Sequence, residues 1–411
     1  MAIGCFEGIF FLASMQVLNR VSGLENGETE LHTWRQNQNL KPIRFFLQKR
    51  LCILLCFFFL IGVGAVLFGI HMVQTSSKFL PTRKFWNNNR EATKEEDNGS
   101  LSTWINTSLS MSSLMHTMND TQLLWRSTFA SRIKEYPFQR MPKIAFMFLT
   151  RGPLPLRLLW EKFFDAHQSF YSIYIHSLPG YIPDFPVSSP FYQRQIPSQE
   201  AKWGEMSMSN AEKRLLANAL LDISNECFIL LSESCIPLRN FTTVYNYLME
   251  FNRSFLHPFD DQGPDGRGRY HPGLLPEVNI SYWRKGSQWF EVNREVAIEI
   301  VKDTKYYPKF EKFCKPRCYN DEHYFPTMLY IEKPNLLTNR SITYVNWSRR
   351  GSHPATFGGN DISDVFLKKI IDEQSCEYNG NTTHICFLFA RKFAPSSLDP
   401  LLRLAPQLFW Y

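Results

Sequence analysis

Continuous apolar runs alternate with amphipathic segments in the region that follows residue 142. KIAFMFLT, which follows Pro142, and FYSIYIHS, which reaches His176, lack polar alternation and predict strands buried on both faces. LPLRLLWEKFF, which lies between them, has the period of a helix. Strand, helix and strand in succession form a βαβ unit, so the pattern predicts an α/β fold built on a parallel sheet.

The predicted strands place three polar residues at one edge of this sheet. Thr150 and Arg151 follow the first strand, and His176 ends the second. Ligands bind beyond the carboxyl ends of the strands in such sheets, so these residues are candidates for ligand contact. The alternative for His176 is a hydrogen-bonded structural residue, which is the commoner role of a lone histidine at a strand end.

The remaining pattern predicts further elements up to residue 395. Strands are predicted in CFILLSESCIPL, through Trp289 and Phe290, and in CFLFARKFAP; helices are predicted in MSNAEKRLLANALLD, in FTTVYNYLMEF and after Phe290. Residues 258–276, rich in Gly, Pro and Asp, predict a long loop, which is either functional or simply flexible. The pattern shows no internal repeat and no second independent domain.

Asp321 and Glu322 begin an apolar aromatic segment. In NDEHYFPTML, which starts at Asn320, apolar residues recur at helical spacing and predict an amphipathic helix whose first turn carries both carboxylates. One interpretation is structural: Asp321 would be the N-cap and Glu322 would complement the helix dipole. The other is functional: a carboxylate here would act as a general base at a cleft.

Leu51 to Val73 forms one uncharged apolar run of about membrane-spanning length. Basic residues are more numerous before this run than after it, which predicts a cytoplasmic N-terminal side. We therefore expect a single-pass type II membrane protein with a cytoplasmic tail (1–50), an anchor (51–73), a glycosylated stalk (74–136) and one lumenal domain (137–411). A cleaved signal peptide is the alternative, but the length of the run and its distance from the N-terminus favour an anchor.

Potential N-glycosylation sites agree with this orientation, because Asn-x-Ser/Thr is modified only in the secretory lumen. None precedes the predicted anchor. Those that follow it are Asn98, Asn106, Asn119, Asn240, Asn252, Asn279, Asn339, Asn346 and Asn381.

Six cysteines fall in the predicted lumenal part, and an even number in an oxidising compartment indicates disulfides. Cys227, Cys235, Cys314, Cys318, Cys376 and Cys386 allow fifteen pairings, of which we prefer the local pairs Cys314–Cys318 and Cys376–Cys386. A zinc site is the alternative for the first pair, although no second CxxC or nearby Cys/His pair completes four ligands.

Composition narrows the class of protein only broadly. Of 411 residues, 44% are apolar and 15% aromatic, which is ample for a large core and excludes a disordered chain. The net charge of +7 is spread without a long basic block. It is therefore weak evidence for nucleic acid, which we do not expect as a partner, and it equally fits an anionic small ligand.

A series of motifs between about residues 142 and 395 resembles glycosyltransferase family 14, the core-2/I-branching β-1,6-N-acetylglucosaminyltransferases, and most closely its plant branch. The motifs are IYIHSLPGY, LLSESCIPL, RGRYHPG, KGSQWFEVNR, YNDEHYFPTML, YVNWSRRGSHPATF and CFLFARKFAP. The resemblance implies a GT-A type α/β fold, a UDP-sugar donor, inversion at the anomeric carbon and no metal cofactor. In agreement, the chain has no Asp-x-Asp of the kind that holds a divalent ion in metal-dependent GT-A enzymes.

The family neutralises the departing diphosphate with basic side chains. The LFARKF match puts one such role on Lys392. The family's arginine falls nearest residues 352–353, so Arg350 is a neighbouring substitute for the second role. Arg151 and His176 complete the expected UDP-sugar site; His176 stands where the branching enzymes have an aspartate near the nucleotide, which leaves the donor base and sugar open.

The family's Asp-Glu motif carries its general base on the glutamate, which the resemblance assigns to Glu322. Inversion requires one direct displacement, so a carboxylate opposite UDP must accept the proton of the acceptor hydroxyl. The resemblance further implies acceptor contacts from Trp347 and Arg269. Trp203, Trp289 and Trp347 could equally pack in the core.

Together these points predict a Golgi membrane glycosyltransferase. It would move a sugar, N-acetylglucosamine by family inheritance, from a UDP-sugar to a glycan, glycoprotein or cell-wall polysaccharide acceptor, with no cofactor besides the donor substrate. The rival from another class is a catalytically silent, membrane-anchored glycan-binding or scaffolding protein on the same fold, motivated by the altered positions His176 and Ser352. A weaker rival is a receptor-like ectodomain that does not bind UDP.

Overall fold

The computed structural model describes residues 62, 114–129, 139–315, 318–349, 351, 353–372 and 374–409. The chain divides into two units, Met1–Glu96 and Asp97–Tyr411, and all described residues except Gly62 belong to the second. The predicted tail, the predicted anchor apart from Gly62, and the predicted stalk up to residue 113 lie outside the described residues. In the described part of the chain, no helix is both long and apolar enough to cross a membrane.

A six-stranded sheet forms the centre of the second unit, in the order β2-β1-β3-β6-β5-β7. β1 pairs in parallel with β2 and β3, whereas β6 runs antiparallel to β3 and β5. The predicted parallel βαβ unit is therefore confirmed, and an antiparallel part extends the sheet. The strands are β1 (Lys143–Leu149), β2 (Tyr171–His176), β3 (Asn225–Ser232), β5 (Ser254–Phe255), β6 (Glu291–Asn293) and β7 (Leu337–Thr338).

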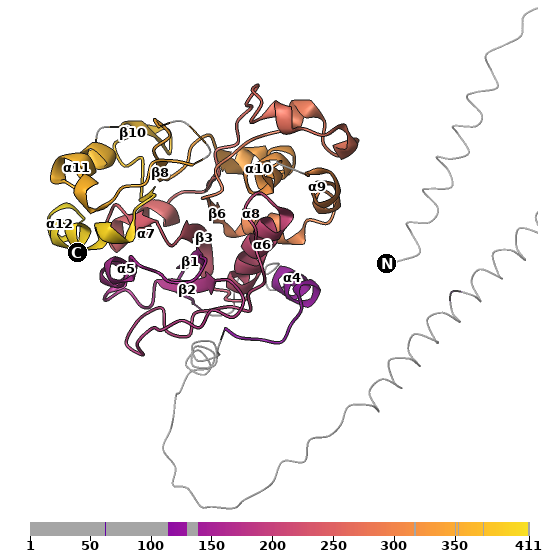
Figure 1. Ribbon diagram of the computed structural model, residues 1–411. Helices are drawn as coiled ribbons and strands as arrows, with labels where there is room; N and C mark the ends of the chain where they lie inside the picture. Colours follow the sequence, from indigo (N-terminus) through magenta and orange to yellow (C-terminus); the bar gives the residue numbers. More distant parts are fainter. Residues whose placement is uncertain are drawn as a thin grey trace, which may run out of the picture. The chain divides into compact units, whose positions relative to one another are not determined.

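Helices cover both faces of this sheet (Figure 1). Phe146 and Phe148 of β1 pack in one core, and Ala145 and Met147 pack in the other, because successive side chains of a strand point to opposite faces. Burial on both sides explains why this strand shows no polar alternation. The first core contains α5 (Arg157–Phe164), α7 (Phe241–Met249), α11 (Asp364–Asp372) and α12 (Leu398–Leu408); the second contains α4 (Asp120–Phe129), α6 (Met206–Leu220), α8 (Arg294–Lys302), α9 (Tyr307–Phe313) and α10 (Asn320–Glu332).

Smaller elements complete the fold. A second sheet has the order β4-β11-β8, with β11 antiparallel to β4 and parallel to β8. CFILLSESCIPL thus supplies two strands, β3 and β4, instead of one. The remaining elements are β4 (Ile236–Pro237), β8 (Thr343–Val345), β11 (Phe389–Arg391), the hairpin β9 (Cys376–Tyr378) and β10 (Asn381–Thr383), and the 3₁₀ helices η1 (Arg267–Arg269), η2 (Pro272–Leu274), η3 (Ile280–Tyr282), η4 (Pro334–Leu336), η5 (Gly359–Asp361) and η6 (Pro395–Ser397).

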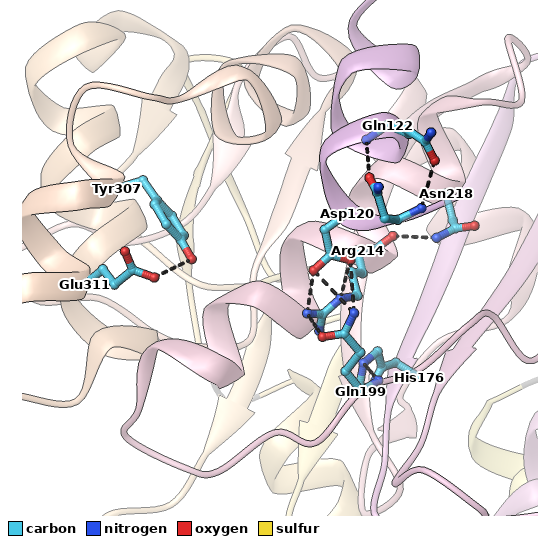
Figure 2. Close-up of polar contacts among 9 residues, drawn as sticks. Asp120, Gln122, His176, Gln199, Arg214, Asn218, Tyr307 and Glu311 are labelled. Carbon is cyan, nitrogen blue, oxygen red and sulfur yellow. Dashed lines mark hydrogen bonds and ion pairs between the residues drawn. The ribbon is translucent and has the colours of Figure 1, made fainter. Parts of the chain in front are cut away.

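Helix α4 lies inside the segment predicted to be a stalk, yet it packs against α6 and α8. Asp120 accepts hydrogen bonds from Nε and Nη2 of Arg214, both at 2.7 Å, and Leu123 is buried in the second core. Arg214 also donates to Gln199 Oε1 at 2.7 Å, and the Gln199 backbone N–H donates to His176 Nε2 at 3.3 Å (Figure 2). Residues before the predicted boundary at 137 therefore belong to the folded unit.

The two local disulfides are confirmed. Cys314 bonds to Cys318, and Cys376 bonds to Cys386. Cys227 is a buried free thiol, and so is Cys235. The disulfide replaces the zinc alternative for Cys314 and Cys318, and no group of three or more His, Cys, Asp or Glu among the described residues is placed to hold a metal ion.

Candidate active site

A cavity of about 1420 Å³ opens where the parallel strands end. Thr150 and Arg151 after β1, His176 at the end of β2 and Ser232 at the end of β3 all line it, as the sequence predicts for the edge of such a sheet. A second cavity of about 610 Å³ shares part of its lining with the first, including Glu322. The two cavities therefore adjoin at shared lining residues, among them Glu322 and Trp347.

The structure brings most of the predicted site residues together. The first cavity is lined by Glu322, Lys392, His176, Arg151 and Trp347. Arg269 lines the second cavity, as do Glu322 and Trp347. Arg350 and its neighbour Ser352 lie outside the described residues.

Glu322 lies in the first turn of α10, which begins at Asn320 as predicted. The N-cap is Tyr319, in a left-handed conformation with φ 56° and no side-chain capping bond, so the interpretation of Asp321 as N-cap is wrong. The helix is also not amphipathic: of its first ten residues only Glu322 is not buried. The helix contacts α6, α8 and α9, which leaves little of its surface to solvent. This packing holds the backbone that carries the Glu322 carboxylate in place.

Two cations hold the Glu322 carboxylate. Arg269 Nη1 donates to Glu322 Oε2 at 2.8 Å, and Lys285 Nζ lies 3.6 Å from the same oxygen. The side chain of Glu322 is 21% exposed, so the carboxylate keeps access to the cavities while its orientation is set. Charge-assisted bonds of this kind fix geometry as well as lower energy.

The long predicted loop 258–276 delivers Arg269 to this position. Arg269 Nη2 donates to Asp265 Oδ1 at 2.9 Å, and the guanidinium lies 4.3 Å from the centroid of the Tyr319 ring. Carboxylates on both sides and an aromatic face below restrain the guanidinium. The loop is therefore a structural part of the site, and the described contacts of Arg269 are with Glu322 and its surroundings.

A glycine allows Lys285 to approach α10. The Gly286 N–H donates to the main-chain oxygen of Glu322 at 2.8 Å. A Cβ at Gly286 would lie 2.6 Å from Cγ of Pro326, which is too close for any larger residue. Backbone hydrogen bonds in both directions between Lys285 and Phe259 fix the other side of this segment.

Asp321, next to Glu322, is buried against a further acid. Burial and the neighbouring Glu322 raise the pKa of Asp321 to about 7. Burial and Asp321 likewise raise the pKa of Glu212, whose Oε1 accepts a hydrogen bond from Gln288 Nε2 at 3.0 Å. Both adjacent carboxyl groups line the first cavity, and Glu322 is the one that forms ion pairs with cations, Arg269 and Lys285.

Lys392 follows β11 and is held through its backbone. Phe357 N–H donates to Lys392 O at 2.9 Å, and Phe393 N–H donates to Ser234 O at 2.9 Å. Burial, followed by the neighbouring Arg391, lowers the pKa of Lys392. The side chains of Lys392 and Arg391 therefore lie close enough to repel one another.

His176 is a buried, neutral ring. Burial and the nearby Arg214 lower its pKa to about 4, against a weaker opposite effect of Asp120. Its Nε2 accepts from the Gln199 backbone N–H (Figure 2). The histidine is thus hydrogen-bonded, as in the structural alternative, and it also lines the cavity.

The three tryptophans differ in environment. Trp289 is buried and lies under Arg391, whereas Trp347 is 52% exposed and Trp203 is 41% exposed. Both exposed rings line both cavities. The expectation that these rings could pack in the core therefore holds for Trp289 alone, and sequence reasoning gave no role to Lys285 or Arg391. The signals were present, because both lie inside recognised motifs, KGSQWFEVNR and CFLFARKFAP.

Comparison with known proteins places this chain in a family. Residues 144–371 match the family model described as Core-2/I-Branching enzyme. The chain is also similar to a protein named Glycosyltransferase BC10 from Oryza sativa subsp. japonica, with 36% identity over 311 residues that cover 64% of this chain and 76% of the rice protein. The chain therefore belongs to the core-2/I-branching enzyme family, glycosyltransferase family 14, in its plant branch, and is a glycosyltransferase of that family.

Proposed function

We propose that this chain is an inverting, metal-independent transferase that moves a sugar from a UDP-sugar to a glycan or glycoprotein acceptor on a GT-A type fold. The observation that carries the proposal is one cavity lined both by Glu322, a carboxylate oriented by two cations, and by Lys392 among further cations. A base and an anion site are the two parts that a single displacement at an anomeric carbon needs.

Glu322 is proposed as the general base. The acceptor hydroxyl oxygen forms a bond to the anomeric carbon as its proton passes to the carboxylate. The bond from that carbon to the β-phosphate oxygen breaks, and its electron pair leaves with UDP. Arg269 and Lys285 hold the carboxylate in the geometry that this transfer needs, which is where positioning contributes to rate.

Lys392 is proposed to bind the diphosphate and stabilise its charge as UDP departs. Its position after β11 is fixed by one backbone hydrogen bond to its own oxygen and one from the next residue, Phe393, so little reorganisation is needed when the charge develops. Arg151 and His176 line the same cavity and are proposed to contact the donor. Arg350 stays a sequence-based candidate for a second cation.

The acceptor is proposed to lie against Trp347. Its exposed ring lines both cavities, and so does Trp203, whose ring centroid lies 4.8 Å from that of Tyr319. Flat aromatic surfaces suit the apolar faces of sugar rings on a glycan, a glycoprotein or a cell-wall polysaccharide. We propose N-acetylglucosamine as the transferred sugar, which follows from the family resemblance.

We further propose a single-pass type II protein of the Golgi membrane, anchored by residues 51–73 with the catalytic domain in the lumen. Two disulfides in the domain support an oxidising compartment. The sequon asparagines Asn119, Asn252, Asn279, Asn339 and Asn381 are exposed, which glycosylation requires.

The test is a donor screen on the purified full-length chain in detergent with EDTA present. We expect one UDP-sugar to raise the Tm and to be transferred or slowly hydrolysed. Glu322→Gln should keep the Tm and lose turnover, whereas Glu295→Gln, an exposed carboxylate on α8, should behave as wild type. Turnover retained by Glu322→Gln would refute the role of the base. UDP binding without turnover of any donor would favour the silent scaffold.

A further inference from the structure

Arg391 presents to the cavity a cation that has no hydrogen-bond acceptor or ion-pair partner among the described residues. It ends β11 and lines the cavity, and its guanidinium lies 4.0 Å from the centroid of the Trp289 ring. Its Nε is buried and has no hydrogen-bond partner, and no ion pair or hydrogen bond joins this guanidinium to another described residue. The aromatic face supports the side chain but satisfies none of its N–H donors.

Such an arrangement is costly for a protein alone. A guanidinium carries five donors, and the buried Nε–H of Arg391 loses its hydration with no acceptor to replace it. Burial lowers the pKa of Arg391 to about 10, with Cys235 and Glu233 acting in the opposite direction, so the group remains a cation at neutral pH. A bound anion would supply the missing acceptors.

The surrounding charges favour an anion of more than one charge. Arg391 and Arg151 both lower the pKa of the neighbouring Lys392, and Glu233 opposes them. Three cations against one carboxylate leave a formal excess of two positive charges. The planar fork of a guanidinium matches phosphate oxygens in pairs, which a lysine cannot do.

We propose that Arg391 binds the phosphate oxygens of the donor's nucleoside diphosphate beside Lys392, and so supplies the second cation of the diphosphate site. The proposal rests on the proposed function for the identity of the anion. It differs from the sequence-based choice of Arg350, because it uses a side chain that the fold already places in the cavity.

A purely structural role for Arg391 makes the opposite prediction for stability. If the guanidinium served only to hold Trp289, its removal would destabilise the free protein. If the guanidinium serves to bind an anion, its removal relieves a buried Nε–H that has no acceptor, and the free protein stays as stable or becomes more stable. Arg391→Met separates these cases, because methionine keeps an apolar stem over Trp289 without the charge.

The experiment measures Kd for UDP, inorganic pyrophosphate and uridine, and the ligand-free Tm, for the full-length chain in detergent with EDTA. For Arg391→Met we expect about a 10- to 100-fold loss of UDP and pyrophosphate affinity, the range for a charge-assisted bond. We expect unchanged uridine binding and an equal or higher Tm. Arg403→Met, an exposed arginine on α12 away from the cavity, is the matched control.

Each other outcome has a defined meaning. Unchanged UDP and pyrophosphate affinity would overturn the proposal, and so would an equal loss of uridine binding, which would show that Arg391 supports the shape of the pocket. If Arg391→Met lowers the Tm, Arg391→Lys decides: retained UDP affinity well above that of the Met variant supports the proposal, and equal loss overturns it. Wild-type binding of UDP without transfer would refute the proposed function but not the role of Arg391.

Discussion

The two charged regions of the cavity are organised in different ways. Glu322 is paired within the protein by Arg269 at 2.8 Å and Lys285 at 3.6 Å. Arg391 and Lys392, by contrast, take part in none of the ion pairs found among the described residues, although they lie close enough to repel. A carboxylate that must act on a substrate proton is oriented in advance, whereas cations without partners are held ready for a charge that arrives with a ligand.

The largest effect is expected at the unpaired cations, Arg391 and Lys392, when Lys392 is removed. We expect Lys392→Ala to lower kcat by about 10² to 10³, because one preorganised electrostatic contact to the departing group is lost. Steady-state transfer from the donor found in the screen measures it. Lys368→Ala, an exposed lysine on α11, should leave kcat unchanged. Equal rates for the two variants would contradict the role of Lys392.

Removing Arg269 tests the other region, in which Glu322 is paired with Arg269 and Lys285. Arg269→Gln should lower kcat by about 10², because the Glu322 carboxylate loses the bond that orients it, while UDP affinity stays unchanged. Arg267→Gln is a close control, since this arginine lies in the same loop but pairs with the exposed Asp260 at 2.7 Å. A loss of UDP affinity in Arg269→Gln equal to its loss of kcat would show that the two regions are not separate.

The disulfide that precedes α10 should affect Glu322 indirectly, by stabilising the segment that leads into the helix. Replacing Cys314 and Cys318 by serine removes a short cross-link, which we expect to cost about 2 kcal/mol of unfolding free energy. Because Tyr319 and Glu322 follow directly, kcat should fall as well, with UDP affinity retained. Denaturant unfolding and transfer assays measure the two effects, and a variant with wild-type stability and kcat would exclude this role.

The smallest effect concerns the buried Asp321. Its pKa rises from 3.8 to about 7 on folding, so the folded state binds more protons than the unfolded state between these values. Stability from this group is present below pH 3.8 and is lost as the pH rises through 7. His176 acts with the opposite sign below pH 6.5.

Asp321→Asn removes the loss of stability that the Asp321 carboxyl group causes as the pH rises. We therefore expect the variant to gain stability relative to wild type, with a larger gain at pH 8 than at pH 5, because no charge is then buried at position 321. Thermal unfolding at both pH values measures the difference. A larger gain at pH 5 than at pH 8 would contradict the assigned direction.

Much of this arrangement could be predicted from the sequence. The uninterrupted run of β1 and its βαβ partner predicted the sheet edge where Arg151 and His176 lie, and short sequence separation predicted both disulfides. The resemblance named Glu322 and Lys392, which line the same cavity.

Other features depend on contacts that no local pattern reveals. The pairing of Glu322 with Lys285 arises because Gly286 packs against Pro326, far along the chain. The N-cap role expected of Asp321 failed because Tyr319 adopts a left-handed conformation after the disulfide. The sequence of helix α4 was interpreted as part of the stalk because its own pattern is weakly apolar and its burial depends on contacts with α6 and α8.

The most direct test of this division of labour measures UDP affinity and single-turnover transfer in the same preparations of the wild-type full-length chain, Glu322→Gln and Lys392→Ala. We expect Glu322→Gln to bind UDP as wild type and to lose transfer by about 10² to 10⁴. We expect Lys392→Ala to lose both. Transfer retained in Glu322→Gln, or UDP affinity unchanged in Lys392→Ala, would contradict a cavity in which one region takes the proton and the other holds the diphosphate.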